Sequence, residues 1–208
     1  MRLKVSRFTR ALACLLVSFT LVLAAIEVSA GAAAGPATAT VNQLLASIGK
    51  LRTTADPGQR DKLIASIDQS LAIRKLSEKA LGAQWSKLDS AEQAHFVALV
   101  KQLLEKIAYP NASQFFAGFT VNVLGEEAQS PHHIVRTTVK RSEGGAISID
   151  YVLEKIEGRW VVVDVILDRQ SLADSMTSQV QATLKSGSYQ DLVAQLQARV
   201  AQANPPAS

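Results

Sequence analysis

The change of hydrophobic period near Gly118 is the feature that most constrains how this chain folds. Before this point apolar residues recur every three or four positions, as in Val41, Leu44 and Leu45, which is the spacing of an amphipathic helix. After it apolar and polar residues alternate, as they do along a half-buried strand. Helical spacing returns from about Leu172. This order predicts an α+β fold, in which N-terminal helices precede a four-stranded antiparallel sheet and C-terminal helices follow it.

Four alternating segments supply the expected strands. They begin near Phe119, Val135, Ile147 and Trp160. Gly144-Gly145 and Glu157-Gly158 stand between the later segments and predict hairpins. Short links of this kind produce a meander with one polar face and one face covered by helices.

Helix-breaking residues divide the rest of the chain. Residues 31–40 are small and unpatterned, so they are expected to form a loose leader. The helical region that follows is expected to break near Leu71. Asp89 or Ser90 is expected to cap the next helix, which ends or bends at Pro110. The last two helices are expected over residues 172–185 and 189–201.

The N-terminus has the three parts of a secretory signal peptide. Residues 1–10 are basic, residues 11–26 are apolar, and Val28-Ser29-Ala30 places small residues at the positions that specify cleavage. The apolar run is shorter than the roughly 20 residues that a membrane span needs. An uncleaved N-terminal anchor is the alternative interpretation.

Cleavage is expected after Ala30, with Ala34 as the alternative site. The expected organisation is a signal peptide over residues 1–30, a single domain over residues 31–201 and a flexible tail over residues 202–208. The mature protein is therefore expected outside the cytoplasm.

The charge of the chain gives no case for a nucleic-acid partner. The formal net charge of +4 comes from 22 basic and 18 acidic residues. Residues 1–30 hold four of the basic residues and one of the acidic ones, so the mature chain has 18 against 17. Such a balanced surface does not attract a polyanion. The single cysteine, Cys14, lies in the apolar run, which excludes a disulfide framework and a thiolate metal cluster in the mature chain.

Candidate catalytic and metal-binding residues are few. His132 and His133 are adjacent, so on a strand they point to opposite faces and cannot chelate one ion together. Asp150 with Tyr151, and Asp164, are candidate acid–base groups. Asp150 falls on the polar face of its strand, and Asp164 is better suited to accepting hydrogen bonds from backbone groups. No catalytic residue, metal or cofactor is expected.

Large aromatic residues gather around the predicted junction between helices and sheet. They are Trp85, Phe96, Tyr109, Phe115, Phe116, Phe119, Tyr151 and Trp160. Each of them alone is explained by a place in the core. As a set they can also line a cavity between the sheet and its covering helices, where small domains hold apolar ligands.

An ordered series of short segments resembles the periplasmic phospholipid-binding MlaC family, also called the toluene-tolerance family. The segments are 67–69, 81–85, Leu88, 90–93 with Phe96, 103–104, Tyr109, 149–151, 158–160, 163–165, 171–172 and 192–196. The resemblance covers about residues 41–201. No single segment is diagnostic, but the ordered combination with a signal peptide is specific.

The resemblance implies a cone-shaped NTF2-like domain with an apolar cavity for acyl chains. It also implies a monomeric periplasmic carrier that exchanges phospholipid with two partners. This exchange is implied to maintain the lipid asymmetry of the outer membrane and tolerance to solvents. One partner is the MCE-domain protein of an inner-membrane ABC transporter, and the other is an outer-membrane lipoprotein complex. A carrier of another lipid, such as a hopanoid, is the alternative.

The chain departs from the family pattern at one turn. Residues 168–171 have Arg169 where the family usually has glycine, which affects the expected turn and any partner or headgroup contact nearby. Arg136, Lys140 and Arg169 are the candidate headgroup contacts.

The predicted lipid site lies between the inner face of the sheet and the long helix. The sheet contributes Phe119, Val121, Val135, Ile149 and Tyr151, the helix contributes Phe96, Val100, Leu103 and Leu104, and Trp85, Tyr109, Phe115, Phe116 and Trp160 complete the set. Two other functions remain open at this stage. A small hydrolase or isomerase requires a buried Asp or His at the base of the cavity, and an adaptor that only bridges proteins requires a filled core.

Overall fold

The structure is a computed structural model that describes residues 35–141 and 145–203. The predicted signal peptide lies outside the described residues, as do Gly144 and residues 204–208 of the predicted tail. Within the described ranges, no helix has both the length and the apolar character needed to cross a membrane.

The strands of the described chain form one five-stranded antiparallel sheet in the order β1-β2-β3-β4-β5. Their bounds are β1 (Phe119–Gln129), β2 (His132–Arg141), β3 (Ala146–Ile156), β4 (Arg159–Leu167) and β5 (Gln170–Ser171). The predicted α+β class and the meander of the first four strands are confirmed. The short β5 was not predicted, because two residues leave no alternating pattern.

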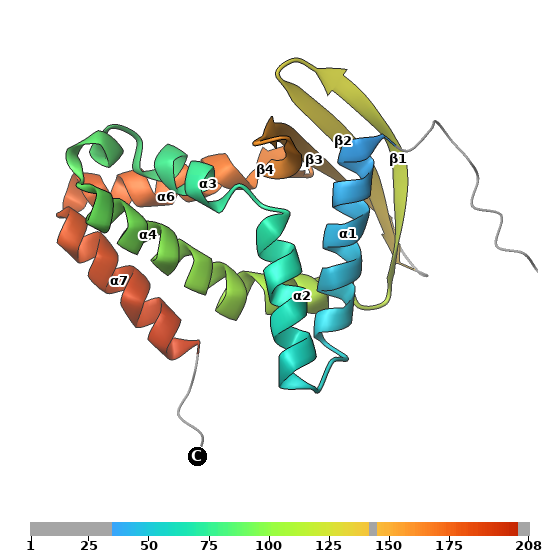
Figure 1. The fold of residues 1–208 in the computed structure, drawn as a ribbon, viewed down its shortest axis with the longest axis horizontal. Helices are drawn as coiled ribbons and strands as arrows, with labels where there is room; N and C mark the ends of the chain where they lie inside the picture. The colour runs from blue at the N-terminus through green and yellow to red at the C-terminus, as the bar shows by residue number, and fades with distance from the viewer. Residues whose placement is uncertain (1–34, 142–144, 204–208) are drawn as a thin grey trace, which may run out of the picture. The chain divides into compact units, whose positions relative to one another are not determined.

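Helices from the first half of the domain cover one face of the sheet (Figure 1). They are α1 (Pro36–Leu51), α2 (Pro57–Gln69) and α5 (Tyr109–Phe116). Their apolar sides pack against Val135, Leu153 and Val162 of the sheet, which are almost completely buried. We call this group of residues the sheet-side cluster.

The remaining helices pack mainly on one another, beside the sheet (Figure 1). They are α3 (Ile73–Leu81), the 3₁₀ segment η1 (Gly82–Lys87), α4 (Ser90–Leu103), α6 (Leu172–Ser186) and α7 (Tyr189–Gln202). Phe96, Val100, Val180 and Leu192 are buried between them. We call this second group the helical cluster. The break predicted near Leu71 and the two predicted C-terminal helices are confirmed.

The link between α2 and α3 fastens the helices to the sheet. The backbone N–H of Ala72 donates to the carbonyl of Val162 at 2.9 Å, and the N–H of Val162 donates to the carbonyl of Ser70 at 2.8 Å. Leu71, between them, packs against both apolar clusters. The link therefore marks the seam between the sheet-side and the helical cluster.

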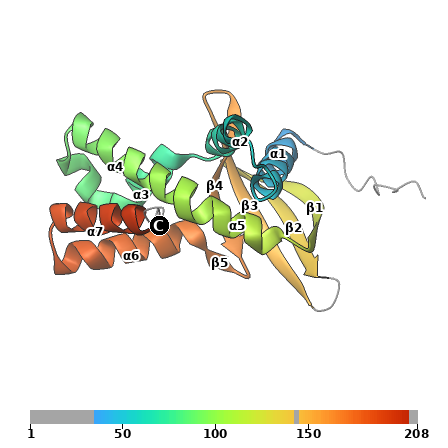
Figure 2. The same ribbon diagram turned by 90° about the horizontal axis from the view of Figure 1, so that it is seen from below.

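A π-helical turn, η2 (Leu104–Ala108), joins α4 to α5 (Figure 2). The N–H of Tyr109 donates to the carbonyl of Leu104, five residues back. Pro110 follows at the start of α5 and has no N–H to donate. The helix nevertheless continues past Pro110 rather than ending there, and the π-helical turn falls at the seam, since Leu104 contacts both clusters.

The expectation of a loose leader is wrong for residues 36–40, because α1 begins at Pro36. The Glu126 carboxylate of β1 accepts hydrogen bonds from the Thr38 N–H at 2.9 Å and from its hydroxyl at 3.0 Å. Ala37 and Val41 are completely buried. These contacts come from β1, almost ninety residues away, so the local sequence gave no sign of them.

A β-bulge in β4 changes which face Asp164 occupies. Leu153 pairs with Val162 and Val152 pairs with Asp164, which leaves Val163 without a partner. Alternation along the strand predicts that Asp164 lies on the same face as Val162. The bulge reverses that placement, because an inserted residue shifts the side chains beyond it to the other face.

Candidate functional site

The predicted lipid-site residues do not gather in one place. Tyr109, Phe116, Phe119, Val121, Val135, Ile149, Tyr151 and Trp160 belong to the sheet-side cluster. Trp85, Phe96 and Val100 belong to the helical cluster, and Leu104 packs against both. The long helix α4 thus presents its apolar side to other helices and only its end to the sheet-side cluster.

Phe115 is the most exposed aromatic of the predicted set. Its ring lies 5.2 Å from the ring of Phe116 and 5.2 Å from that of Phe119, between centroids. Phe115 is 37% exposed to solvent, and it is one of the large exposed apolar residues, together with Val123 and Leu124 of β1.

An apolar groove lies between α4, α6 and α7, with a volume of about 320 Å³. Phe96, Val100, Leu103 and Leu104 line it, so this groove brings together the predicted residues of the long helix. Met176 of α6 lies opposite them. We call it the helical groove. Its walls are apolar enough for a hydrocarbon chain, and it ends at the seam, since Leu104 belongs to both clusters.

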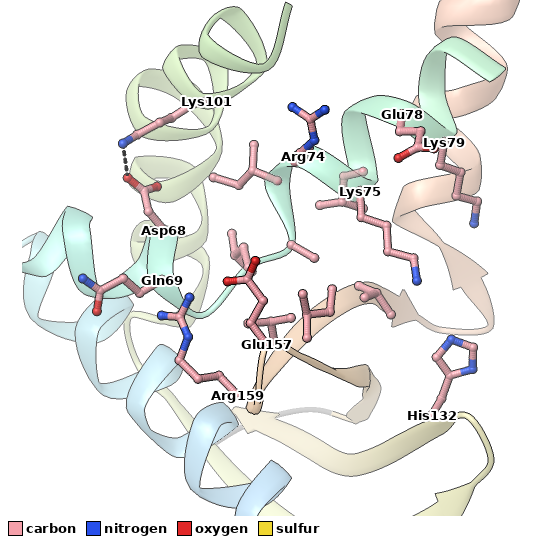
Figure 3. Close-up of a pocket in the computed structure, with 17 residues that line it drawn as sticks. Asp68, Gln69, Arg74, Lys75, Glu78, Lys79, Lys101, His132, Glu157 and Arg159 are labelled. Carbon is pink, nitrogen blue, oxygen red and sulfur yellow. Dashed lines mark ion pairs between the residues drawn. The ribbon is translucent and has the colours of Figure 1, made fainter. Parts of the chain in front are cut away.

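A larger groove of about 980 Å³ lies between α3 and the end of the β3–β4 hairpin (Figure 3). Leu71, Ile73, Leu76, Val161 and Val163 supply the apolar part of its wall. Its charged lining residues are Asp68, Arg74, Lys75, Glu78, Lys79, Lys101, Glu157 and Arg159. We call it the hairpin groove.

The sequence did not predict the hairpin groove, and none of the predicted lipid-site residues lines it. The residues that line it are divided in the sequence between α3 and the β3–β4 hairpin. These two segments come together because Ser70 and Ala72 form backbone hydrogen bonds with Val162 of β4. The proposed headgroup residues Arg136, Lys140 and Arg169 line neither of the two grooves. Arg136 is instead paired with Glu127 at 2.7 Å on the β1–β2 face.

A largely buried carboxylate lies where α2 meets the end of α4 and the π-helical turn. Asp68 accepts a hydrogen bond from the Tyr109 hydroxyl at 2.7 Å, and the Lys101 ammonium lies 3.0 Å from its other oxygen. Lys101 also pairs with Glu105 of the π-helical turn at 3.6 Å. We call Asp68, Lys101, Glu105 and Tyr109 the Asp68 network. It ties α2 to α4, to η2 and to α5, directly across the seam.

The Asp68 network shifts the pKa values of its members. The contact with Asp68 raises the pKa of Lys101. Burial, and then the negative charge of Asp68, raise the pKa of Glu105. Burial is also the main cause of the raised pKa of Tyr109, with Asp68 adding to it, so this phenol stays protonated and donates to Asp68.

The histidines do not form a metal site within the described residues. His133 Nδ1 lies 2.7 Å from Glu126, the residue that caps α1, and the His133 ring packs 4.2 Å from that of Trp160. His132 lies on the other side of the strand pair, with Nε2 3.6 Å from Glu154. The expectation that the two histidines point apart is met.

Asp164 organises the start of α6. Its carboxylate accepts hydrogen bonds from the N–H of Val165 at 2.8 Å, the N–H of Ala173 at 3.0 Å and the hydroxyl of Ser171 at 2.6 Å. This agrees with the predicted role as an acceptor for backbone groups. Arg169, in the adjacent turn, has a φ of 70°, in the region that favours glycine.

The fold and its two grooves define an α+β ligand-binding domain with an apolar interior. Residues 38–198 match the family model described as MlaC protein. The chain therefore belongs to the MlaC family, and the resemblance predicted from the sequence is confirmed. This family consists of lipid-binding carriers rather than enzymes, which agrees with the prediction that the chain is not an enzyme.

A search of solved structures found a similar fold in a phospholipid-binding protein from Ralstonia solanacearum, solved in complex with a phospholipid. The TM-score is 0.67 at 24% identity, and the match covers 83% of this chain and 99% of that chain. A search of curated proteins found no match.

Proposed function

We propose that this protein is a periplasmic phospholipid carrier. The observation that carries the proposal is the family match over residues 38–198, and the shared fold with a protein solved around a phospholipid supports it. The proposed route runs between the MCE-domain protein of an inner-membrane ABC transporter and an outer-membrane lipoprotein complex. The protein is proposed to act as a monomer that reaches the periplasm by its cleaved signal peptide.

The physical need for such a carrier is large. Each buried methylene is worth about 0.8 kcal/mol, so two chains of roughly 15 methylenes face about 24 kcal/mol on leaving a bilayer. An apolar slot replaces the contacts that the bilayer supplied and leaves the polar head in water. This task requires no catalytic group.

We place the acyl chains along the seam between the two apolar clusters. The helical groove offers the first apolar surface, lined by Phe96, Val100, Leu103 and Leu104. Separation of the clusters at Leu104 then exposes the sheet-side residues of the predicted set to the chains. The Asp68 network spans the same seam and holds it closed when no lipid is bound.

The enzyme alternative requires a buried acid that is free to act on a substrate, and Asp68 does not meet this requirement. Asp68 and Tyr109 do form an acid–phenol pair, but the Tyr109 hydroxyl and the Lys101 ammonium already occupy both carboxylate oxygens. Such a pair is suited to joining helices. The family also consists of carriers.

Lipid analysis of the purified mature protein tests the proposal. Mass spectrometry of a solvent extract is expected to find phospholipid in near-stoichiometric amount. A protein that never carries an amphiphile out of cells would refute the carrier function, and an extract containing a hopanoid would replace the proposed cargo.

A tryptophan in the helical groove tests the placement of the chains. Leu103→Trp is expected to remove most of the bound lipid, because its ring fills the groove, while the fold is retained. Leu124→Trp is the matched control, since Leu124 is 59% exposed on β1. Val135→Trp is less informative, because Val135 is completely buried and overpacking costs about 1–3 kcal/mol. Full lipid content in Leu103→Trp contradicts this placement.

A further inference from the structure

Charged side chains around the hairpin groove divide into paired and unpaired groups. The lysines of the groove pair with carboxylates, Lys75 with Glu154, Lys79 with Asp174, and Lys101 with both Asp68 and Glu105, and His132 also lies 3.6 Å from Glu154. Each of these lysines is neutralised by a neighbouring carboxylate, so none of them is available as a free cation. The unpaired charges of the groove are therefore the ones that can recognise a ligand.

Glu157 lies in the turn of the β3–β4 hairpin, Arg159 directly follows that turn, and both are unpaired. Both are exposed, and among the described residues neither side chain has an ion pair or a hydrogen bond. Glu157 and Gly158 have φ values of 50° and 80°, as in a tight two-residue hairpin turn. Figure 3 shows both side chains extending from the hairpin toward the α2–α3 link.

The opposite wall of the groove repeats this pattern on α3. Among the residues that the structure describes, the Arg74 guanidinium has no carboxylate partner, and it lies 5.2 Å from the centre of the Trp85 ring. Glu78, one helical turn further on, has no ion pair within the described chain. The groove thus presents unpaired charges of both signs.

Charges of both signs suit a zwitterion better than an anion. An arginine guanidinium binds a phosphate through two parallel hydrogen bonds. A purely anionic headgroup would gain that contact at Arg159 but would meet the repulsion of the Glu157 carboxylate beside it. A headgroup that also carries a primary amine satisfies both residues, because its ammonium donates to the carboxylate.

The wall between these charges is apolar, which is what the glycerol end of a lipid requires. Leu71, Ile73, Leu76, Val161 and Val163 form it. Leu71 belongs to both apolar clusters, so this surface leads from the charged rim to the seam where the acyl chains are placed.

We propose that the hairpin groove is the headgroup site of the carrier and that it selects phosphoethanolamine headgroups. Arg159 holds the phosphate and Glu157 holds the primary ammonium. This inference rests on the proposed function, and it adds a preference among phospholipids that the carrier function alone does not contain.

A competition among lipids with identical acyl chains tests the selectivity. The mature protein is incubated with vesicles containing equal amounts of phosphatidylethanolamine, phosphatidylglycerol and phosphatidylcholine, then re-isolated, and its lipid is measured by mass spectrometry. The ethanolamine lipid is expected to be enriched about two- to fivefold over the other two, as for one exposed charge pair. Phosphatidylcholine is disfavoured because its quaternary amine has no N–H to donate.

Two variants separate the roles of the unpaired residues. Glu157→Gln is expected to lower the ratio of ethanolamine to glycerol lipid about two- to fivefold without lowering total lipid, and Arg159→Gln to lower uptake of all three. Glu127→Gln and Arg52→Gln, which alter exposed charged residues outside both grooves, are the matched controls. An unchanged ratio in Glu157→Gln, or unchanged uptake in Arg159→Gln, overturns the headgroup site. Absence of any lipid on the unaltered protein refutes the proposed function instead.

A headgroup without acyl chains distinguishes the lipid from a free anion. Glycerophosphoethanolamine is expected to shift the NMR amide signal of Gly158 in the unaltered protein and to leave it in place in Arg159→Gln. Inorganic phosphate is expected to shift it less. Equal shifts with phosphate alone would show a general anion site and would overturn the proposed selectivity.

Discussion

The sheet-side cluster and the helical cluster are built from the same kinds of side chain, but they differ in how they meet the two grooves. None of the buried members of the sheet-side cluster lines either groove. Buried members of the helical cluster line both of them, with Ile73 in the hairpin groove and Phe96, Val100 and Leu192 in the helical groove. The buried residues that reach these two grooves therefore come from the helical cluster and not from the sheet-side cluster.

The difference follows from how the two layers are held together. Backbone hydrogen bonds fix the spacing of the strands, and Thr137, completely buried, adds a bond to the carbonyl of Ile149 at 2.7 Å. Packed helices are joined through their side chains rather than by ladders of backbone hydrogen bonds, and they can slide by small amounts at low cost. A carrier that must open for its cargo is best served by a rigid sheet and a helical layer that can shift. The seam at Leu71 and Leu104 is where the two layers meet.

The largest expected effect comes from truncating one leucine in each layer, which tests the difference between the sheet-side and the helical cluster. Leu153→Ala, at a completely buried position of the sheet-side cluster, is expected to lower the free energy of unfolding by about 3 kcal/mol. Leu103→Ala removes a side chain that already lines a groove, so it leaves no closed cavity and is expected to cost about 1 kcal/mol or less.

Urea denaturation of the lipid-free protein measures both values. Equal losses in the two variants would contradict the comparison, because they would place the groove residue in an environment as closed as that of Leu153.

The Asp68 network supplies the second test, since it crosses the seam. Asp68→Asn removes the charge that pairs with Lys101 while keeping the shape of the side chain, and it is expected to lower the free energy of unfolding by about 2 kcal/mol. Tyr109→Phe is expected to cost about 1 kcal/mol, because it removes one hydrogen bond.

The same variants also report on opening. If the network holds the seam closed, Asp68→Asn accelerates lipid exchange between protein and vesicles, measured with a fluorescent phospholipid, whereas Leu153→Ala leaves the exchange rate nearly unchanged. Slower or unchanged exchange in Asp68→Asn would show that the network is a structural contact only.

Periodicity predicted the elements well because the signal for each element is local. The four main strands and the break near Leu71 both depend on a few neighbouring residues. The start of α1 at Pro36 was missed because its cap, Glu126, comes from a distant strand.

The arrangement of the site was harder to predict. Apolar spacing showed that Phe96 and Val100 face inward, but it contains no information on whether they face the sheet or other helices. The bulge at Val163 lies in a continuous run of apolar residues, where alternation gives no signal. The hairpin groove depends on charges from segments that only the tertiary fold brings together.

The smallest expected effect is the pH dependence that Glu105 confers on the seam. Burial and the neighbouring Asp68 hold the pKa of Glu105 above its ordinary value of 4.5 in the folded protein. A group whose folded pKa is raised binds its proton more tightly when folded, so its contribution to stability is present below about pH 4.5 and is lost as the pH rises through the folded pKa.

Glu105→Gln is therefore expected to be more stable than the unaltered protein at pH 7 and to lose this advantage toward pH 4.5. Thermal unfolding of both proteins across this range measures the difference. The advantage is reduced by the ion pair that Glu105 makes with Lys101, which favours the charged form and is lost in the variant. A variant that becomes relatively more stable as the pH falls would show that this pair outweighs the burial of Glu105, and that the π-helical turn strengthens the closed seam at neutral pH.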